Sequence, residues 1–139
     1  MNLRRALITW ALLFVIAFAN GALRELTYAR RMSLLAAHQL SCFTGISALA
    51  LAIWTVNRRW PFRSYGQAWR TGFLWMALTT GWEFVFGHFV MGHTWGRLLA
   101  DYAIWQGRLW ILVLISIVLL PPLVFRLDLH KRSTSGNMV

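Results

Sequence analysis

Four long apolar segments dominate the chain, and short polar segments separate them. They cover residues 6–23, 32–56, 69–90 and 104–125. Each supplies about 20 residues, the helical length that crosses roughly 30 Å of hydrocarbon. Because lipid offers no partner for free backbone groups, such segments span a membrane as α-helices. The pattern predicts an all-α membrane protein: a four-helix transmembrane bundle with short loops, forming a single domain over residues 1–128.

The two ends of the chain qualify this prediction. Arg4–Arg5, an apolar core and then Ala17–Ala19 resemble a secretory signal with a small-residue cleavage site. We interpret the first segment as an uncleaved helix, because apolar residues continue past that site to Leu23. Near the other end, Pro121–Pro122 should kink or end the last helix. The polar residues 129–139 are expected to form a disordered cytoplasmic tail.

Basic residues are distributed unequally between the two ends of the predicted bundle. With four crossings, both termini and the middle loop share one side. Nine basic residues fall on that side: Arg4, Arg5, Arg58, Arg59, Arg63, Arg70, Arg126, Lys131 and Arg132. Five fall on the other: Arg24, Arg30, Arg31, Arg97 and Arg108. The positive-inside rule places the richer side in the cytoplasm, which predicts an N-in/C-in multi-pass protein of the bacterial inner membrane.

The composition supports the membrane class and excludes others. Hydrophobic residues make up 58% of the chain and charged residues 13%, about half the charged fraction of a typical soluble domain. The formal charge of +10 could indicate nucleic-acid binding, but the arginines lie at the ends of apolar segments and form no basic stripe. We therefore expect the lipid bilayer, and no nucleic acid, as partner. A single cysteine, Cys42, excludes an intramolecular disulfide.

Glu83 is the only carboxylate well inside an apolar segment. A charge at membrane depth costs about 2.5–3.5 kcal/mol, so it needs a partner, a proton or a function. Helical rise places Glu83 about 20 Å above Arg70 at the cytoplasmic boundary and His38 about 10 Å below the outer boundary. In a hydrocarbon core roughly 30 Å thick these two heights coincide. Asn20 and the long side chain of Arg108 reach nearly the same layer. The predicted polar pocket therefore contains Glu83, His38, Arg108 and Asn20.

A second tier of polar residues is predicted between this pocket and the outer surface. Its members are Arg24, Glu25, His88, Arg97 and Asp101, with His93 beside them. Arg24–Glu25 and Arg97–Asp101 are expected to form local ion pairs, the second at i, i+4 spacing if that turn is helical. Small and polar residues also form one face on each of two helices, which favours close helix packing in lipid. These faces are His38, Ser41, Gly45, Ala48 and Ala52 in one, and Gly72, Met76, Thr79 or Thr80, Glu83 and Gly87 in the other. Direct packing of the two faces is our hypothesis.

Three histidines near Glu83 raise the question of a metal or haem. His38, His88 and His93 could bind zinc together with Glu83, and haem could lie between His38 and His88. No two of these histidines have the i, i+4 spacing of a helical metal site. We therefore predict no metal and no cofactor, and we assign no catalytic residue.

A set of positions spread over most of residues 20 to 110 carries a resemblance to known proteins. These positions are Asn20, Gly21, Arg24, Glu25, Ala37, His38, Gln39, Ser41, Thr79, Glu83, Phe84, Phe86, Gly87, Met91, Gly92, Trp95, Leu99, Asp101, Tyr102, Gly107, Arg108, Leu109 and Trp110. The resemblance is to a group of small bacterial four-helix membrane proteins that has no established activity. It implies the four-helix architecture and transfers no function.

The sequence favours a non-enzymatic role. Our first interpretation is a small transporter or an accessory subunit with an outward-facing polar pocket around Glu83. A bundle this small would need a homo-oligomer or a membrane partner protein to enclose a transport path. The alternatives are an integral-membrane enzyme or redox protein acting on a lipid or quinone, and an assembly or structural factor of a membrane complex.

Overall fold

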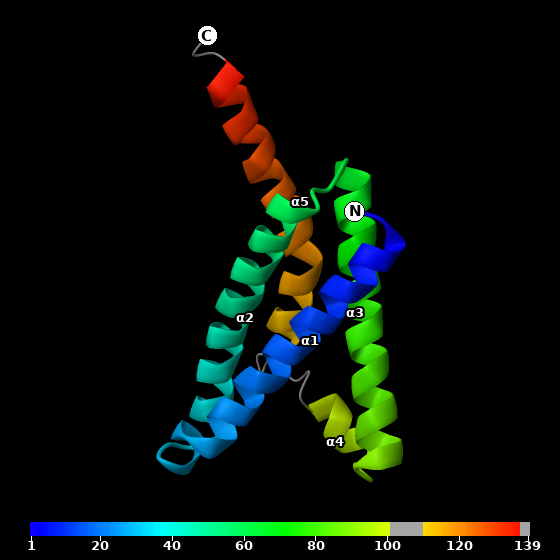
Figure 1. The fold of residues 1–139 in the computed structure, drawn as a ribbon. Coiled ribbons are helices and arrows are strands. Elements are labelled where there is room, and N and C mark those ends of the chain that lie inside the picture. Colours follow the sequence, from blue (N-terminus) through cyan, green and yellow to red (C-terminus); the bar gives the residue numbers. More distant parts are fainter. Residues whose placement is uncertain (101–109, 137–139) are drawn as a thin grey trace.

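The computed structural model describes residues 1–100 and 110–136, which are almost entirely helical (Figure 1). Their α-helices are α1 (Leu3–Leu26), α2 (Leu34–Arg59), α3 (Tyr65–Val85), α4 (Trp95–Ala100) and α5 (Trp110–Gly136). A 3₁₀ turn, η1 (Tyr28–Arg30), joins α1 to α2, and a π-helical turn, η2 (Phe86–Val90), extends α3. The predicted all-α class is confirmed.

Polar side chains set the starts of the first three helices. Asn2 accepts a hydrogen bond from the backbone N–H of Arg5, and Ser33 and Ser64 do the same for Ala36 and Gln67. Such caps satisfy amide groups that have no partner within the helix. They explain why α1 and α3 begin before the apolar segments do, at residues 3 and 65.

Within residues 1–100 and 110–136, three stretches are long and apolar enough to cross a membrane. They are Leu3–Arg30, Leu34–Arg59 and Ile111–Gly136, so the chain is a multi-pass membrane protein. Among the described helices, α3 has 21 residues but falls outside this set. Arg70, Glu83 and several glycines and threonines lower its hydropathy. The sequence therefore predicted one crossing more than length and composition alone support.

Many large apolar side chains are exposed at the surface of the bundle. Leu34 is 81% exposed and Phe18 71%, whereas Trp75, Leu49 and Ile53 are fully buried between helices. A soluble protein rarely leaves so much apolar surface uncovered. This distribution fits a bundle whose outer surface contacts lipid.

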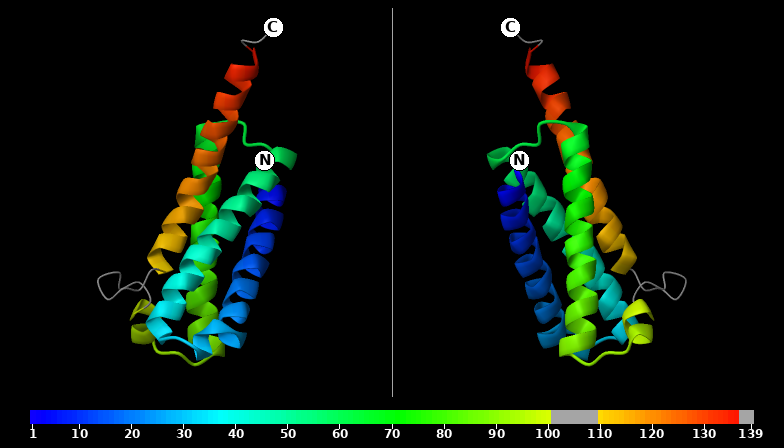
Figure 2. Two further views of the ribbon diagram at one scale, coloured as in Figure 1. Left: turned by 90° about the vertical axis from the view of Figure 1, so that its left-hand side faces the viewer. Right: turned by 90° about the vertical axis from the view of Figure 1, so that its right-hand side faces the viewer.

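The helices pack in the order α1, α2, α5, α3 around the bundle (Figure 2). α2 lies between α1 and α5, and α3 lies mainly along α5. The hypothesis that the small-residue face of α2 packs directly on α3 is therefore wrong. Gly45 on that face meets the side chain of Asn20 from α1 instead.

α3 and α5 approach each other closely at Gly72. A Cβ atom at this position would lie 2.7 Å from the carbonyl oxygen of Val118 and 3.1 Å from that of Ile117. In a regular helix these two carbonyls would accept from residues 122 and 121, but both are proline and lack an N–H. The glycine thus brings the backbone of α3 onto the two α5 carbonyls that lose their helical donors to proline.

The last helix differs from its prediction in two respects. α5 continues through Pro121 and Pro122, which lie inside it, and does not end there. It also extends to Gly136, so residues 129–136, expected to be disordered, are helical. An ion pair between Asp128 and Arg132, at i, i+4 spacing and 3.0 Å, supports this extension.

Candidate functional site

A cavity of about 930 Å³ lies at the end of the bundle that carries η1 and α4. Its walls come from α1, η1, α2, α3, η2 and α4. Six of its lining residues carry charged or titratable side chains: Arg24, Glu25, His38, Glu83, His93 and Arg97. The structure therefore assembles polar groups from four helices and from the turn after η2.

Glu83 and His38, the centre of the predicted pocket, both line this cavity. Glu83 lies in the last turn of α3, and His38 lies in the second turn of α2. Both side chains are half-buried. His38 Nε2 also lies 3.7 Å from Cys42 Sγ, one helical turn further along α2. The two residues share the cavity although α2 and α3 do not pack along each other.

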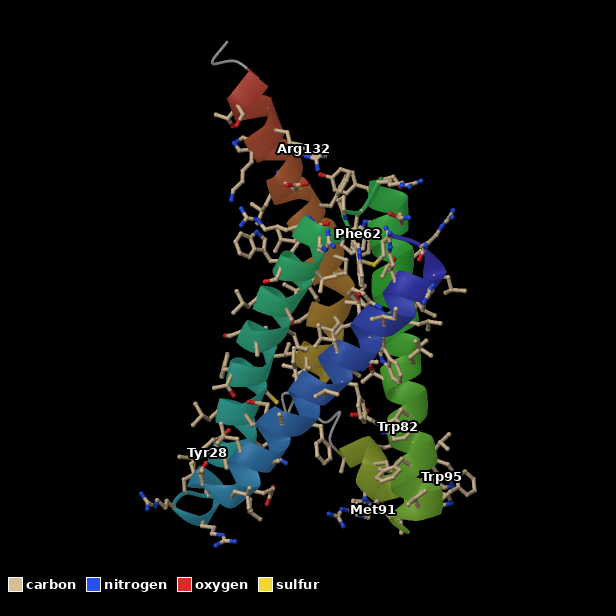
Figure 3. The ribbon with its side chains drawn as sticks, in the orientation of Figure 1. Tyr28, Phe62, Trp82, Met91, Trp95 and Arg132 are labelled. Atoms are coloured by element: carbon tan, nitrogen blue, oxygen red, sulfur yellow. The ribbon has the colours of Figure 1, made fainter. Side chains whose placement is uncertain are left out.

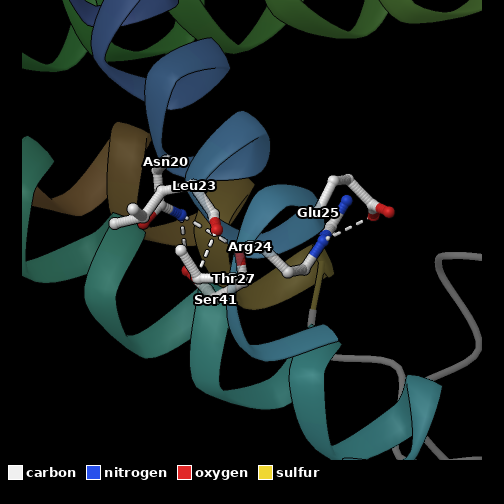
Figure 4. Close-up of polar contacts among 6 residues, drawn as sticks. All are labelled: Asn20, Leu23, Arg24, Glu25, Thr27 and Ser41. Atoms are coloured by element: carbon white, nitrogen blue, oxygen red, sulfur yellow. Dashed lines mark hydrogen bonds and ion pairs between the residues drawn. The ribbon is translucent and has the colours of Figure 1, made fainter. Parts of the chain in front are cut away.

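Asn20 was predicted to face the pocket, but its side chain points toward α2 instead (Figure 4). Its amide nitrogen donates to the carbonyl oxygen of Ser41 at 2.8 Å and to Ser41 Oγ at 3.0 Å. Its amide oxygen accepts from Thr44 Oγ1 at 2.8 Å. Asn20 is not among the described residues that line the cavity. It joins α1 to α2.

Asn20→Leu is expected to weaken the α1–α2 contact, because it removes three hydrogen bonds and leaves the Ser41 and Thr44 hydroxyls without this partner. Hydrogen bonds between membrane helices contribute about 0.6–2 kcal/mol each. Thermal unfolding in mild detergent should show a lower midpoint. Asn2→Ala, which removes only a helix cap, is the comparison, and an equal effect of the two changes would contradict the role of Asn20.

The outer-tier residues Arg24 and Glu25 form the expected ion pair, with 3.1 Å between Arg24 Nε and Glu25 Oε1 (Figure 4). Arg24 is the less exposed partner, at 28% against 66%. Both residues also line the cavity. One wall of the site therefore presents a guanidinium and a carboxylate side by side.

His88, placed in the same tier by sequence, stabilises the turn after α3. Its Nδ1 lies 2.9 Å from the carbonyl oxygen of His93, and its ring stacks on Trp95 with centroids 3.8 Å apart. The chain turns at Gly92, whose φ of 70° favours glycine. Beyond this turn, the side chain of Leu98 packs against Gly87 and so holds α4 against η2. Figure 3 shows Trp95 and Met91 in this region.

Arg97 lies on α4 and lines the cavity. Two further predicted residues, Arg108 in the pocket and Asp101 in the outer tier, lie outside the described residues. The expected Arg97–Asp101 pair therefore stays a prediction, as does the place of Arg108 in the pocket with Glu83.

Aromatic residues of the cavity wall are the part of the site that sequence reasoning missed. Phe14 of α1 meets Trp82 of α3 edge to face, with centroids 5.3 Å apart, and Trp82 stacks on Phe86. Phe18 completes this part of the wall. The four-residue spacing of Trp82 and Phe86 was the available signal, since it places both on one helix face.

Comparison with known proteins adds no identity. No family model matches the sequence, and no curated protein or solved structure shows significant similarity to it. The resemblance to small bacterial four-helix proteins is supported only as far as an all-helical chain with three apolar spans. Within the described part of the chain, no group of three His, Cys, Asp or Glu residues is placed to hold a metal.

Proposed function

We propose that this protein is a small transporter or an accessory subunit of the inner membrane that binds its ligand in the cavity around Glu83. One observation carries the proposal: Glu83, a half-buried carboxylate from inside an apolar segment, lines the same cavity as His38, Arg24 and Arg97. Ionisable groups at membrane depth are expensive and usually mark a pathway or a binding site. A purely structural ion pair would not require a cavity of about 930 Å³.

The arrangement of the ends supports an outward-facing site. The N-terminus, the last turns of α5 and the α2–α3 connection lie toward one end of the bundle, and η1 and α4 lie at the other (Figure 1). The first end carries nine basic residues, which favours the cytoplasm. We propose that α3 makes a fourth crossing, since it runs alongside α5. The cavity would then open near the periplasmic face.

Replacing Glu83 tests this proposal. Glu83→Gln keeps the shape of the side chain and removes its titration, so the pH dependence of the melting temperature should become flatter. Thermal unfolding in nanodiscs across the range in which carboxyl and imidazole groups titrate would measure it. Asp128→Asn, outside the cavity on α5, is the control. Unchanged pH profiles and full stability for both Glu83→Gln and Glu83→Leu would reduce Glu83 to a packing residue.

Oligomerisation is a second part of the proposal. A single bundle of this size cannot surround a transport path, so a homodimer or a larger complex is expected. Mass from blue native gels of mildly solubilised membranes would reveal either assembly. A strictly monomeric particle without co-purifying protein would contradict transport by this chain alone.

A further inference from the structure

The cavity is lined mainly by apolar side chains where it borders the gap between α1 and α3. These helices meet near the end that holds the N-terminus, where Trp75 Nε1 donates to the carbonyl oxygen of Ala6 at 2.8 Å and Trp10 Nε1 donates to Thr79 Oγ1 at 3.1 Å. From there the two ribbons diverge toward the end that holds α4 (Figure 1). The cavity occupies this wedge, with Phe14, Ala17 and Phe18 on one side and Trp82 and Phe86 on the other.

The rim of the wedge lies at the depth of the hydrocarbon. Phe18 is thirteen residues beyond Arg5 and Trp82 is twelve beyond Arg70, which places both about 18–20 Å into a layer roughly 30 Å thick. Their side chains are 71% and 44% exposed. An opening bordered by exposed aromatic rings at this depth meets acyl chains and not water.

Among the described residues that line the cavity, positive and negative side chains are equal in number. Arg24 and Arg97 supply two guanidinium groups, and Glu25 and Glu83 supply two carboxylates. Guanidinium groups bind phosphate oxygens in a bidentate manner. The carboxylates would repel a ligand with only negative charge, but they complement an ammonium group. This combination matches a headgroup that carries both signs.

We infer that the cavity binds the phosphodiester–ammonium headgroup of a zwitterionic membrane lipid, which enters between α1 and α3. The phosphodiester contacts Arg24 and Arg97, and the ammonium group contacts Glu83 or Glu25. The acyl chains stay in the bilayer along Phe18 and Trp82. The volume of about 930 Å³ lies in the range of small-ligand sites, so the cavity has room for a lipid headgroup. The inference rests on the proposed function, because it names the ligand of the same cavity.

Native mass spectrometry of the purified full chain in detergent micelles tests the inference. The probes are phosphatidylethanolamine, phosphatidylglycerol of equal chain length, and water-soluble glycerophosphoethanolamine as competitor. We expect preferential retention of phosphatidylethanolamine. Arg97→Gln and Arg24→Gln should each weaken it about tenfold, as expected for loss of one charged hydrogen bond. Arg70→Gln, at the opposite end, should leave retention unchanged.

A second pair of variants tests the route of entry. Ala17 lines the cavity on α1, so Ala17→Trp should fill the wedge and reduce lipid retention. Ala11→Trp, at an exposed position of the same helix, is the matched control. Melting temperatures equal to that of the wild type would show that both variants fold. If Ala17→Trp alone fails to fold, the two arginine variants decide the test.

Several outcomes would overturn the inference. Equal retention in Ala17→Trp and Ala11→Trp would exclude the lateral route. Phosphatidylglycerol bound as tightly as phosphatidylethanolamine would exclude recognition of an ammonium group. Displacement by the soluble headgroup at concentrations that match the lipid would indicate a water-soluble ligand. None of these outcomes contradicts the proposed function if Glu83→Gln still changes the pH dependence of the melting temperature. If that pH dependence is unchanged, the proposed function itself is contradicted.

Discussion

Trp75→Ala is expected to destabilise the protein by about 3–5 kcal/mol, a large part of the stability of a small domain. Trp75 is fully buried on α3, and its indole N–H donates to the carbonyl oxygen of Ala6 on α1. The substitution removes the largest fully buried side chain among the described residues and leaves a void in the packing around α3. It also removes one of the two hydrogen bonds described above that hold α1 to α3 at the closed end of the wedge.

Unfolding in mild detergent would measure this effect, with two variants for comparison. Trp75→Phe retains most of the apolar volume and removes the N–H donor, so it should cost far less. Trp69→Ala removes the same side chain from a position that is 38% exposed and should have a small effect. Equal destabilisation by Trp75→Ala and Trp69→Ala would contradict the packing described for α3.

Gly72→Ala is expected to separate α3 from α5, with a cost of about 1–3 kcal/mol from overpacking alone. The added methyl group would lie 2.7 Å from Val118 O and 3.0 Å from Val118 Cα. Both are backbone atoms, so no side chain can rotate to relieve the collision. Separation would also remove Gly72 from the carbonyls that lose their helical donors to Pro121 and Pro122.

Two other glycine substitutions distinguish this collision from a general effect of alanine. Gly81, also on α3, has no atom within 4 Å of an added Cβ. Gly81→Ala should therefore be neutral or stabilising, since alanine favours helix by roughly 1 kcal/mol. At Gly87 the added Cβ would meet only the flexible end of Leu98, which can move, so its cost should be intermediate. The same melting temperature for all three variants would contradict the close contact at Gly72.

The helices of this protein could be predicted from sequence because each prediction used local information. A run of about 20 apolar residues leaves water as a helix whatever its neighbours are. Asn2, Ser33 and Ser64 cap helices through residues three positions further on. The exceptions were also local in origin: Pro121 and Pro122 were expected to kink or end a helix that continues through them.

The candidate site could be predicted only in part. Counting residues along a helix gives the height of a side chain in the membrane, and it placed Glu83 and His38 in one layer. Asn20 reached a similar height, yet it points toward Ser41 and Thr44. Height is one coordinate of three, and the direction of a side chain around its helix depends on which helix packs beside it.

The sequence by itself determined that this chain enters a membrane as helices, which segments form the long helices apart from their exact ends, and which end carries most positive charge. These properties follow from the transfer of each segment out of water, which does not depend on the other segments. Only the tertiary structure decided that α3 packs on α5, that Asn20 joins α1 to α2, and that α1 and α3 diverge around a cavity. Those outcomes depend on contacts between residues far apart in the chain, such as Gly72 with Val118, and on the fit of their surfaces.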